Sequence, residues 1–219
     1  MSEFIVHSVP GSPYGRSVFA TLIEKGARYR LAPVTPQTRK SEPHISRHPF
    51  GRVPVLEHDG FLLYETQAIL RYLDRTLPQP ALTPADPRAA ARMDQVMNIC
   101  DWYLFNGVCN VIAFQRFVRP RLLNEPCDEA AIAGAMPQAH AVFRELSRLL
   151  GGEPYFAGDD MTLADLMIAP QLDFLIATPE WAVLAAPVPN LVSWIGRMNA
   201  RESFAATTME HIVQLAKSA

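Results

Sequence analysis

The chain has 219 residues, of which 49% are hydrophobic and 19% are charged, and its formal net charge is -2. A chain of this length can bury a hydrophobic core, as one large domain or as two small ones. The near-neutral charge and the scattered basic residues argue against a nucleic-acid-binding protein and against a polybasic membrane patch.

The N-terminus, Met1 to Phe4, lacks the basic region and the long apolar run of a secretory signal. The longest uncharged stretch, near Trp102 to Gln115, is too short to cross a bilayer. We therefore expect a soluble cytoplasmic protein with no membrane partner.

A loop from Gly11 to Gly15 separates a short apolar strand at Phe4 to Val6 from a helical pattern at Ser17 to Gly26. It resembles the active-site loop of glutaredoxin-like folds, with Ser12 and Gly15 at the two cysteine positions. Serine cannot form a disulfide, so thiol–disulfide exchange is excluded here. Its hydroxyl can instead donate to a thiolate from another molecule, near a helix N-terminus that favours negative charge. The alternative is an ordinary turn with a helix cap.

The segment from His48 to Ile69 predicts a strand, a tight turn at Asp59-Gly60, a second strand and then a helix that opens at Glu65-Thr66. Pro54 lies among strand residues, where proline removes a backbone donor and is disfavoured in a central position. Only about 5–6% of X-Pro bonds in folded proteins are cis, so the Val53-Pro54 bond taken alone is expected to be trans. A cis bond would instead turn this edge toward a ligand and would explain why the proline is tolerated. The remaining strand candidates of this half are Ile5 and Leu31 to Val34.

Four prolines fall within eleven residues between Leu77 and Pro87, a stretch that cannot continue a helix and predicts an interdomain linker. Helical patterns alone follow it. The predicted helices are Arg88 to about Val118, Glu129 to Leu150, Leu163 to Leu175, Leu191 to Asn199 and a tail from Met209. The predicted domains are residues 1–78 and 88–219, joined by residues 79–87.

Taken together, these segments resemble the soluble (cytosolic) glutathione S-transferases over essentially the whole chain. The resemblance rests on four motifs in the expected order: Ser12-Pro13-Tyr14, His48 to Pro54, Glu65-Thr66, and the Thr162-Leu163-Ala164-Asp165 capping box. A further match, Arg39-Lys40-Ser41, is similar to the serine-type plant phi class and related bacterial members. The resemblance implies a thioredoxin-like α/β domain, residues 1–78, followed by an all-α bundle domain.

The implied function is transfer of small electrophiles to glutathione, which acts as co-substrate. Ser12 is the expected catalytic residue, and Tyr14 is the competing hydroxyl. The expected glutathione-binding residues are Ser12, Arg39, Lys40, Arg52, Val53, Pro54, Glu65 and Thr66. Among these, Glu65 supplies an acid for the γ-glutamyl ammonium, while Arg52 replaces a usual glutamine and its contact is open.

The electrophile pocket is expected between the two domains, where small-molecule sites often form. Its candidate lining residues are Pro10, Pro13, Tyr103, Phe105, Asn106, Asn110 and Phe114. Aromatic residues at helical spacing also fit a helix core, and nothing in this set selects a substrate class. A glutathione-dependent isomerase, peroxidase or dehalogenase on the same scaffold, or a non-catalytic binding protein, is the alternative.

We expect no metal site, because Pro49 interrupts the helix that would align His44 with His48. The three cysteines, Cys100, Cys109 and Cys127, have no paired spacing and are expected to be free thiols. Phe50 is a large apolar residue on a loop expected to be exposed, which indicates a contact surface. In the family this position can insert between helices of a second copy, so the resemblance implies a homodimer.

Overall fold

The computed structural model describes residues 3–217 and divides the chain into two compact units. The first unit contains the residues up to Thr83 together with those from Ala200 onward, and the second spans Pro84–Asn199. The units therefore divide the chain differently from the predicted domains, because the last segment packs with the first unit. Over residues 3–217, no helix combines the length and apolar character needed to cross a bilayer.

The first unit is a thioredoxin-like α/β domain built on a mixed four-stranded sheet. The strands are β1 (Phe4–Ser8), β2 (Tyr29–Pro33), β3 (Val55–His58) and β4 (Phe61–Tyr64). Their order is β2-β1-β3-β4, with β1 and β2 parallel and the other neighbours antiparallel. The hairpin predicted at Asp59-Gly60 joins β3 to β4, and both turn residues have positive φ.

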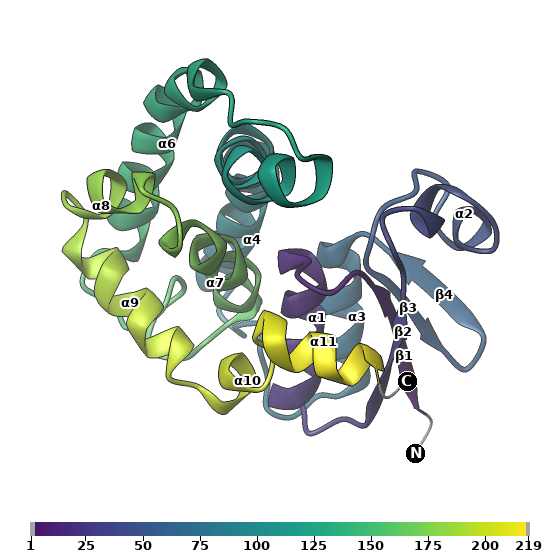
Figure 1. The fold of residues 1–219 in the computed structure, drawn as a ribbon. Helices are drawn as coiled ribbons and strands as arrows, with labels where there is room; N and C mark the ends of the chain where they lie inside the picture. Colours follow the sequence, from purple (N-terminus) through teal and green to yellow (C-terminus); the bar gives the residue numbers. More distant parts are fainter. Residues whose placement is uncertain (1–2, 218–219) are drawn as a thin grey trace. The chain divides into compact units, whose positions relative to one another are not determined.

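Helices α1 (Pro13–Glu24) and α3 (Thr66–Thr76) lie side by side against the sheet, as Figure 1 shows. Their apolar faces and the alternate residues of the strands form a core that water does not reach. Its members include Val6, Val18, Phe19, Leu22, Leu31, Val55, Leu56, Ile69, Leu70 and Leu73. Two short helices, η1 (Thr38–Lys40) and α2 (His44–Arg47), lie in the connection from β2 to β3.

A buried ion pair fixes the proline-rich segment to the ends of α1 and α3. Lys25 Nζ lies 2.5 Å from Asp74 Oδ1 and also donates to the carbonyl of Pro80. Asp74 accepts from the Leu82 N–H at 2.9 Å and from the Thr83 hydroxyl at 2.5 Å. Burial disfavours the charged form of Asp74, but these donors outweigh it and hold its pKa below the ordinary value.

The segment after Ala200 is fixed to α1 of the same unit. It contains α10 (Glu202–Ala205) and α11 (Met209–Lys217), the latter lying beside β2 in Figure 1. Arg201 Nε and Nη2 each donate to Glu24 at 2.8 Å, and Ser203 Oγ donates to the same carboxylate at 2.6 Å. A bidentate pair with a third donor holds this segment more firmly than an exposed ion pair would.

Every regular element in the described part of the second unit is a helix. Its elements are α4 (Pro87–Ile99), η2 (Cys100–Cys109), α5 (Asn110–Ala113), η3 (Phe114–Leu123), α6 (Glu129–Leu150), α7 (Leu163–Ile176), α8 (Glu180–Ala185) and α9 (Pro189–Asn199). The bundle predicted from sequence is confirmed, and the predicted bounds of α6 match those observed. The short helices α8 and α10 were not predicted.

The long helical run from Pro87 to Leu123 contains two π-helical segments, η2 and η3. The sequence predicted an ordinary helix here. Within η2, Asn106 Nδ2 donates to the carbonyl of Asp101 at 2.8 Å, five residues earlier. Gln138 of α6 donates to the carbonyl of Tyr103 at 3.0 Å across Gly107, where a Cβ would lie only 1.8 Å from the Gln138 amide nitrogen. Side-chain amides thus donate hydrogen bonds to two backbone carbonyls of this segment, those of Asp101 and Tyr103.

The centre of the second unit is the fully buried carboxylate of Asp165. It accepts hydrogen bonds from Thr162 N–H and Thr162 Oγ1, both at 2.9 Å, from Phe156 N–H at 3.1 Å and from Trp194 Nε1 at 2.8 Å. The predicted capping box at the start of α7 is therefore present. Because Trp194 belongs to α9 and Phe156 to the preceding loop, one side chain joins three parts of the unit.

Replacing Asp165 with Ala should lower stability by at least about 3 kcal/mol, because several buried donors lose their only acceptor. Chemical denaturation should show this as a lower midpoint, with kinetic constants of the surviving folded protein nearly unchanged. Asp160→Ala is the matched control, since Asp160 is exposed in the same stretch of chain. A normal midpoint for Asp165→Ala with lost activity would contradict a purely structural role.

Candidate active site

The strand register brings the predicted site loops to one end of the sheet. Val55, the first residue of β3, pairs with His7 near the end of β1. On its other side Val55 pairs with Tyr64, the last residue of β4. Pro33, at the end of β2, pairs with Ser8. The chain segments that carry Ser12, Lys40, Val53 and Glu65 all leave or enter the sheet at this end.

Ser12 is the N-cap of α1 and is half-buried. Its Oγ accepts the N–H of Gly15 at 3.1 Å, while its own N–H donates to the carbonyl of Val9 at 3.1 Å. A hydroxyl has one hydrogen to donate in addition to its acceptor sites. In the described part of the chain no acceptor for that hydrogen is found, so capping and donation to a ligand are compatible.

Gly15 sits where α1 comes closest to β1. A Cβ at this position would lie 2.1 Å from Ser8 Oγ and 3.2 Å from Ser8 Cβ. Ser8 is completely buried, so it has little room to move aside. The position that holds a second cysteine in glutaredoxin-like loops therefore has no space for a side chain here.

Val53 offers a backbone with both hydrogen-bonding groups available. It is half-buried, and across residues 3–217 its N–H and C=O make no backbone hydrogen bond. The Val53–Pro54 bond is cis, and Pro54 is buried. An extended ligand can pair with such a segment in the way that an added strand pairs with a sheet edge.

Glu65 precedes the first residue of α3 and has φ 71 and ψ 114. A residue with a side chain is held in this region at a cost of about 1–3 kcal/mol, so such a conformation is typical of functional sites. The Glu65 carboxylate is exposed, and Thr66 behind it is buried. An acid and a helix N-terminus are thus adjacent, which suits an ammonium beside a carboxylate.

The basic residues expected to bind the ligand lie on η1 and on the loop before β3. Lys40 and Arg52 are both exposed. Arg39 is half-buried, and its Nη1 donates to the carbonyl of Gly51 at 3.1 Å. Arg39 therefore also holds the loop that leads to Val53.

Two histidines beneath this loop were considered in the sequence only as metal ligands. His44 and His48 are each 2% exposed, with ring centroids 6.4 Å apart. Burial lowers the pKa of His48, and the neighbouring His44 and Arg52 lower it further. Their spacing of four residues across α2 was the signal available in the sequence, but it did not indicate the contact of His44 Nε2 with the Arg52 carbonyl at 2.7 Å. Among the described residues no group of three or more potential ligands is arranged for a metal ion.

The expected electrophile-pocket residues are divided between the two units. In the first unit, Pro10 and Pro13 are half-buried on either side of the Gly11–Ser12 turn. In the second unit, Tyr103, Asn106 and Asn110 are exposed on the π-containing helix, and Phe105 and Phe114 are half-buried. These five side chains are therefore not part of the closed helix core.

The cysteines are all free, as predicted. Cys100 and Cys109 are buried among the helices, where burial raises the pKa of both thiols. Cys127 is half-buried, and its Sγ lies 3.0 Å from the carbonyl of Gln115.

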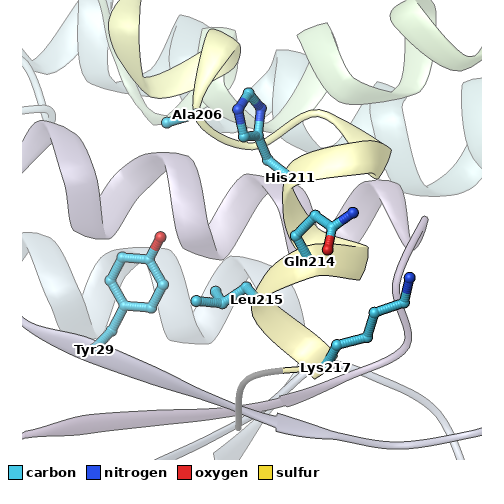
Figure 2. A pocket seen from close by; sticks show the side chains of 6 residues that line it. All are labelled: Tyr29, Ala206, His211, Gln214, Leu215 and Lys217. Atoms are coloured by element: carbon cyan, nitrogen blue, oxygen red, sulfur yellow. The ribbon is translucent and has the colours of Figure 1, made fainter.

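A cavity of about 490 Å³ opens on the first unit between β2 and the C-terminal helix. Figure 2 shows its lining residues, Tyr29, Ala206, His211, Gln214, Leu215 and Lys217. They are exposed or half-buried, and none belongs to the site loops described above.

Comparison with known proteins gives a consistent family. Residues 6–81 match the family model for the glutathione S-transferase N-terminal domain, and residues 111–202 match that for the C-terminal domain. A glutathione S-transferase of Hyoscyamus muticus is 30% identical over 203 residues, covering 91% of this chain and 94% of the relative. The Hypomyces subiculosus glutathione S-transferase hmp2 is 30% identical over 199 residues, with 88% and 92% covered. The solved apo structure of glutathione S-transferase III is 29% identical, with a TM-score of 0.83 over 94% of this chain and 95% of that one.

Proposed function

This chain belongs to the glutathione S-transferase family, and we propose that it joins glutathione to small electrophiles with the Ser12 hydroxyl stabilising the thiolate. The observation that carries this assignment is the hydrogen bond from Gly15 N–H to Ser12 Oγ at 3.1 Å. It fixes the oxygen at the helix start and leaves the hydroxyl hydrogen for a sulfur atom.

Lowering the pKa of the glutathione thiol requires only a small free energy from Ser12. A thiol has a pKa of about 8.5, and a depression of one unit corresponds to about 1.4 kcal/mol. A hydrogen bond to a charged group contributes about 1.5–3 kcal/mol, and the N-terminus of α1 adds a favourable field. Glutathione then releases its thiol proton, its sulfur forms a bond to an electrophilic carbon, and a leaving group departs with the electron pair of its bond.

The three parts of glutathione have complementary groups on the first unit. Glu65 pairs with the γ-glutamyl ammonium, and Thr66 with its N–H at the start of α3 receives the adjacent carboxylate. Val53 pairs through its backbone with the cysteinyl residue, at the turn that Pro54 follows. Lys40, helped by Arg39, neutralises the glycine carboxylate, and Arg52 adds a further positive charge beside it.

Candidate electrophile-binding residues are proposed within each unit. In the first unit Pro10 and Pro13 flank Ser12, and in the second unit the exposed or half-buried residues of the π-containing helix are Tyr103, Phe105, Asn106, Asn110 and Phe114. A mainly apolar set of side chains suits a small hydrophobic electrophile.

We also propose that the protein acts as a homodimer through Phe50. This side chain is 69% exposed although its ring contacts His48 and Tyr64 edge-on, at centroid distances of 6.0 and 6.4 Å. A phenyl ring in that position is partly ordered by its own unit and still presents most of its surface. A symmetric pair of copies would bury it twice.

Replacing Ser12 with Ala should reduce kcat by about 10- to 100-fold, because a hydrogen bond to a charged sulfur is lost. Binding of glutathione should change only a few-fold. The thiolate absorbance of bound glutathione should titrate about one to two units higher than in the wild type.

Ser12→Thr is the matched control, because it retains both the helix cap and the hydroxyl donor. It should restore most of the activity. Identical titration curves for the wild type and Ser12→Ala would overturn the role of Ser12.

Replacing Glu65 with Gln should weaken glutathione binding by at least about tenfold, since truncating one member of a charged, hydrogen-bonded pair costs about 2–5 kcal/mol. Titration calorimetry measures this directly. Asp59→Asn, an equally conservative change at an exposed residue with positive φ, should leave the dissociation constant unchanged. An unaltered constant in Glu65→Gln would mean that the γ-glutamyl end binds elsewhere.

Replacing Phe50 with Ala should raise the dissociation constant of the dimer at least tenfold, because a phenyl ring loses about 3 kcal/mol or more of packing on truncation. Analytical sedimentation over a series of micromolar concentrations measures this dissociation constant. Val183→Ala, which removes another exposed apolar side chain, is the control. A fully active wild-type monomer at those concentrations would refute the dimer.

A further inference from the structure

A buried imidazole holds the peptide group that precedes the proposed cysteinyl contact. His44 Nε2 lies 2.7 Å from the carbonyl oxygen of Arg52, and the side chain is 2% exposed. A carbonyl oxygen can only accept, so Nε2 carries the hydrogen and donates it. This places a fixed donor from α2 beneath the loop before β3.

The carbonyl of Arg52 and the N–H of Val53 belong to the same planar peptide group. The cis bonds among residues 3–217 are three X-Pro bonds, so the Arg52–Val53 bond is trans. In a trans peptide the C=O and the N–H point in opposite directions. Fixing the Arg52 carbonyl toward His44 therefore fixes the Val53 N–H on the opposite side.

The residues before this peptide are held as well, so rotation about neighbouring bonds is restricted. The carbonyl of Gly51 accepts a hydrogen bond from Arg39 Nη1 at 3.1 Å. The N–H of Gly51 donates to the backbone carbonyl of His48 at 2.8 Å. Gly51 has φ 59, and a Cβ there would lie 2.9 Å from the carbonyl of Arg39. Two consecutive carbonyls, those of Gly51 and Arg52, are thus bound by side chains just before Val53.

Burying the His44 imidazole costs free energy, because only one of its two ring nitrogens is paired within residues 3–217. Its Nδ1 is buried and has no hydrogen-bond partner among the described residues, and leaving a buried acceptor unpaired destabilises a fold. An apolar side chain of similar volume would fill the same space without that cost. Packing alone therefore does not account for a histidine at this position.

We propose that His44 is a positioning residue for glutathione, which aims the Val53 N–H at the cysteinyl carbonyl of the bound tripeptide. The inference rests on the proposed function, in which Val53 pairs with that residue. Donation to the Arg52 carbonyl also polarises the shared peptide group, so the Val53 N–H becomes a stronger donor. His44 itself touches neither substrate.

The test compares two ligands on several variants. The first is glutathione, and the second is γ-glutamyl-cysteinyl-glycolate, in which an ester replaces the cysteinyl-glycine amide and its carbonyl is a weaker acceptor. We expect calorimetry to show that the wild type binds glutathione about five- to tenfold more tightly than the ester. In His44→Leu, which lacks the donor, this ratio should fall to about two or less. Loss of the glycine N–H in the ester affects both proteins and cancels in the comparison.

Kinetics supply a second readout that a merely structural role would not produce. In His44→Leu the KM for glutathione should rise about fivefold or more, with kcat and the KM for the electrophile within twofold of wild type. His44→Gln, whose amide can donate from a similar place, should restore both the KM and the ligand ratio. Should His44→Leu fail to fold, His44→Met gives the same comparison with a more adaptable side chain.

His48→Leu is the matched control, because it removes an equally buried imidazole that donates to neither loop carbonyl. It should lower the melting temperature and leave the ligand ratio near the wild-type value. If the wild type binds both ligands equally, the Val53 contact of the proposed function is wrong. If the wild type distinguishes them and His44→Leu does so equally well, that contact stands and the role of His44 is refuted.

Discussion

The close approach of α1 to the end of β1 is the constraint on which the first unit depends. Gly15 has no side chain, and Ser8 fills the space that a Cβ would need. The first turn of the helix therefore begins directly at the sheet, with its N–H groups facing the loop. One of these groups fixes the Ser12 oxygen, so a packing requirement between a helix and a strand also orients the hydroxyl. The register of β1, β3 and β4 then brings the other loops to the same end.

The Asp165 carboxylate and the chain around Val53 differ in how their polar groups are paired. In the second unit the fully buried Asp165 carboxylate accepts four hydrogen bonds and serves packing. In the first unit the N–H and C=O of Val53 make no backbone hydrogen bond within residues 3–217, and Glu65 is held at a positive φ that its side chain disfavours. The paired carboxylate stabilises its own unit, whereas under the proposed function the Val53 backbone and the strained Glu65 are the groups that a ligand would use.

Local signals in the sequence were sufficient for much of this fold. The Asp59-Gly60 turn, the proline-rich segment, the capping box and the 22-residue α6 each follow from short-range patterns. The loops of the candidate site could also be predicted, because the motifs at Ser12, at His48 to Pro54 and at Glu65 occur in the order typical of the family. The π-helical segments could not be predicted from spacing, and in η2 one backbone carbonyl, that of Tyr103, is bound by Gln138 from another helix. The contact of His44 with the Arg52 carbonyl could not be predicted either, because the positions of the two residues in the sequence do not give the distance between them.

The pairing of Arg201 with Glu24 spans 177 positions of the chain and makes the first unit discontinuous, with the whole second unit between its two parts. At the usual rates of translation, roughly 5–20 residues per second, about 10 to 35 s pass between the synthesis of the two partners. During that interval α1 emerges from the ribosome without the segment that covers it, while the residues of the second unit are still being added. The helical unit is therefore complete first, and the sheet-containing unit, although it comes first in the chain, closes last.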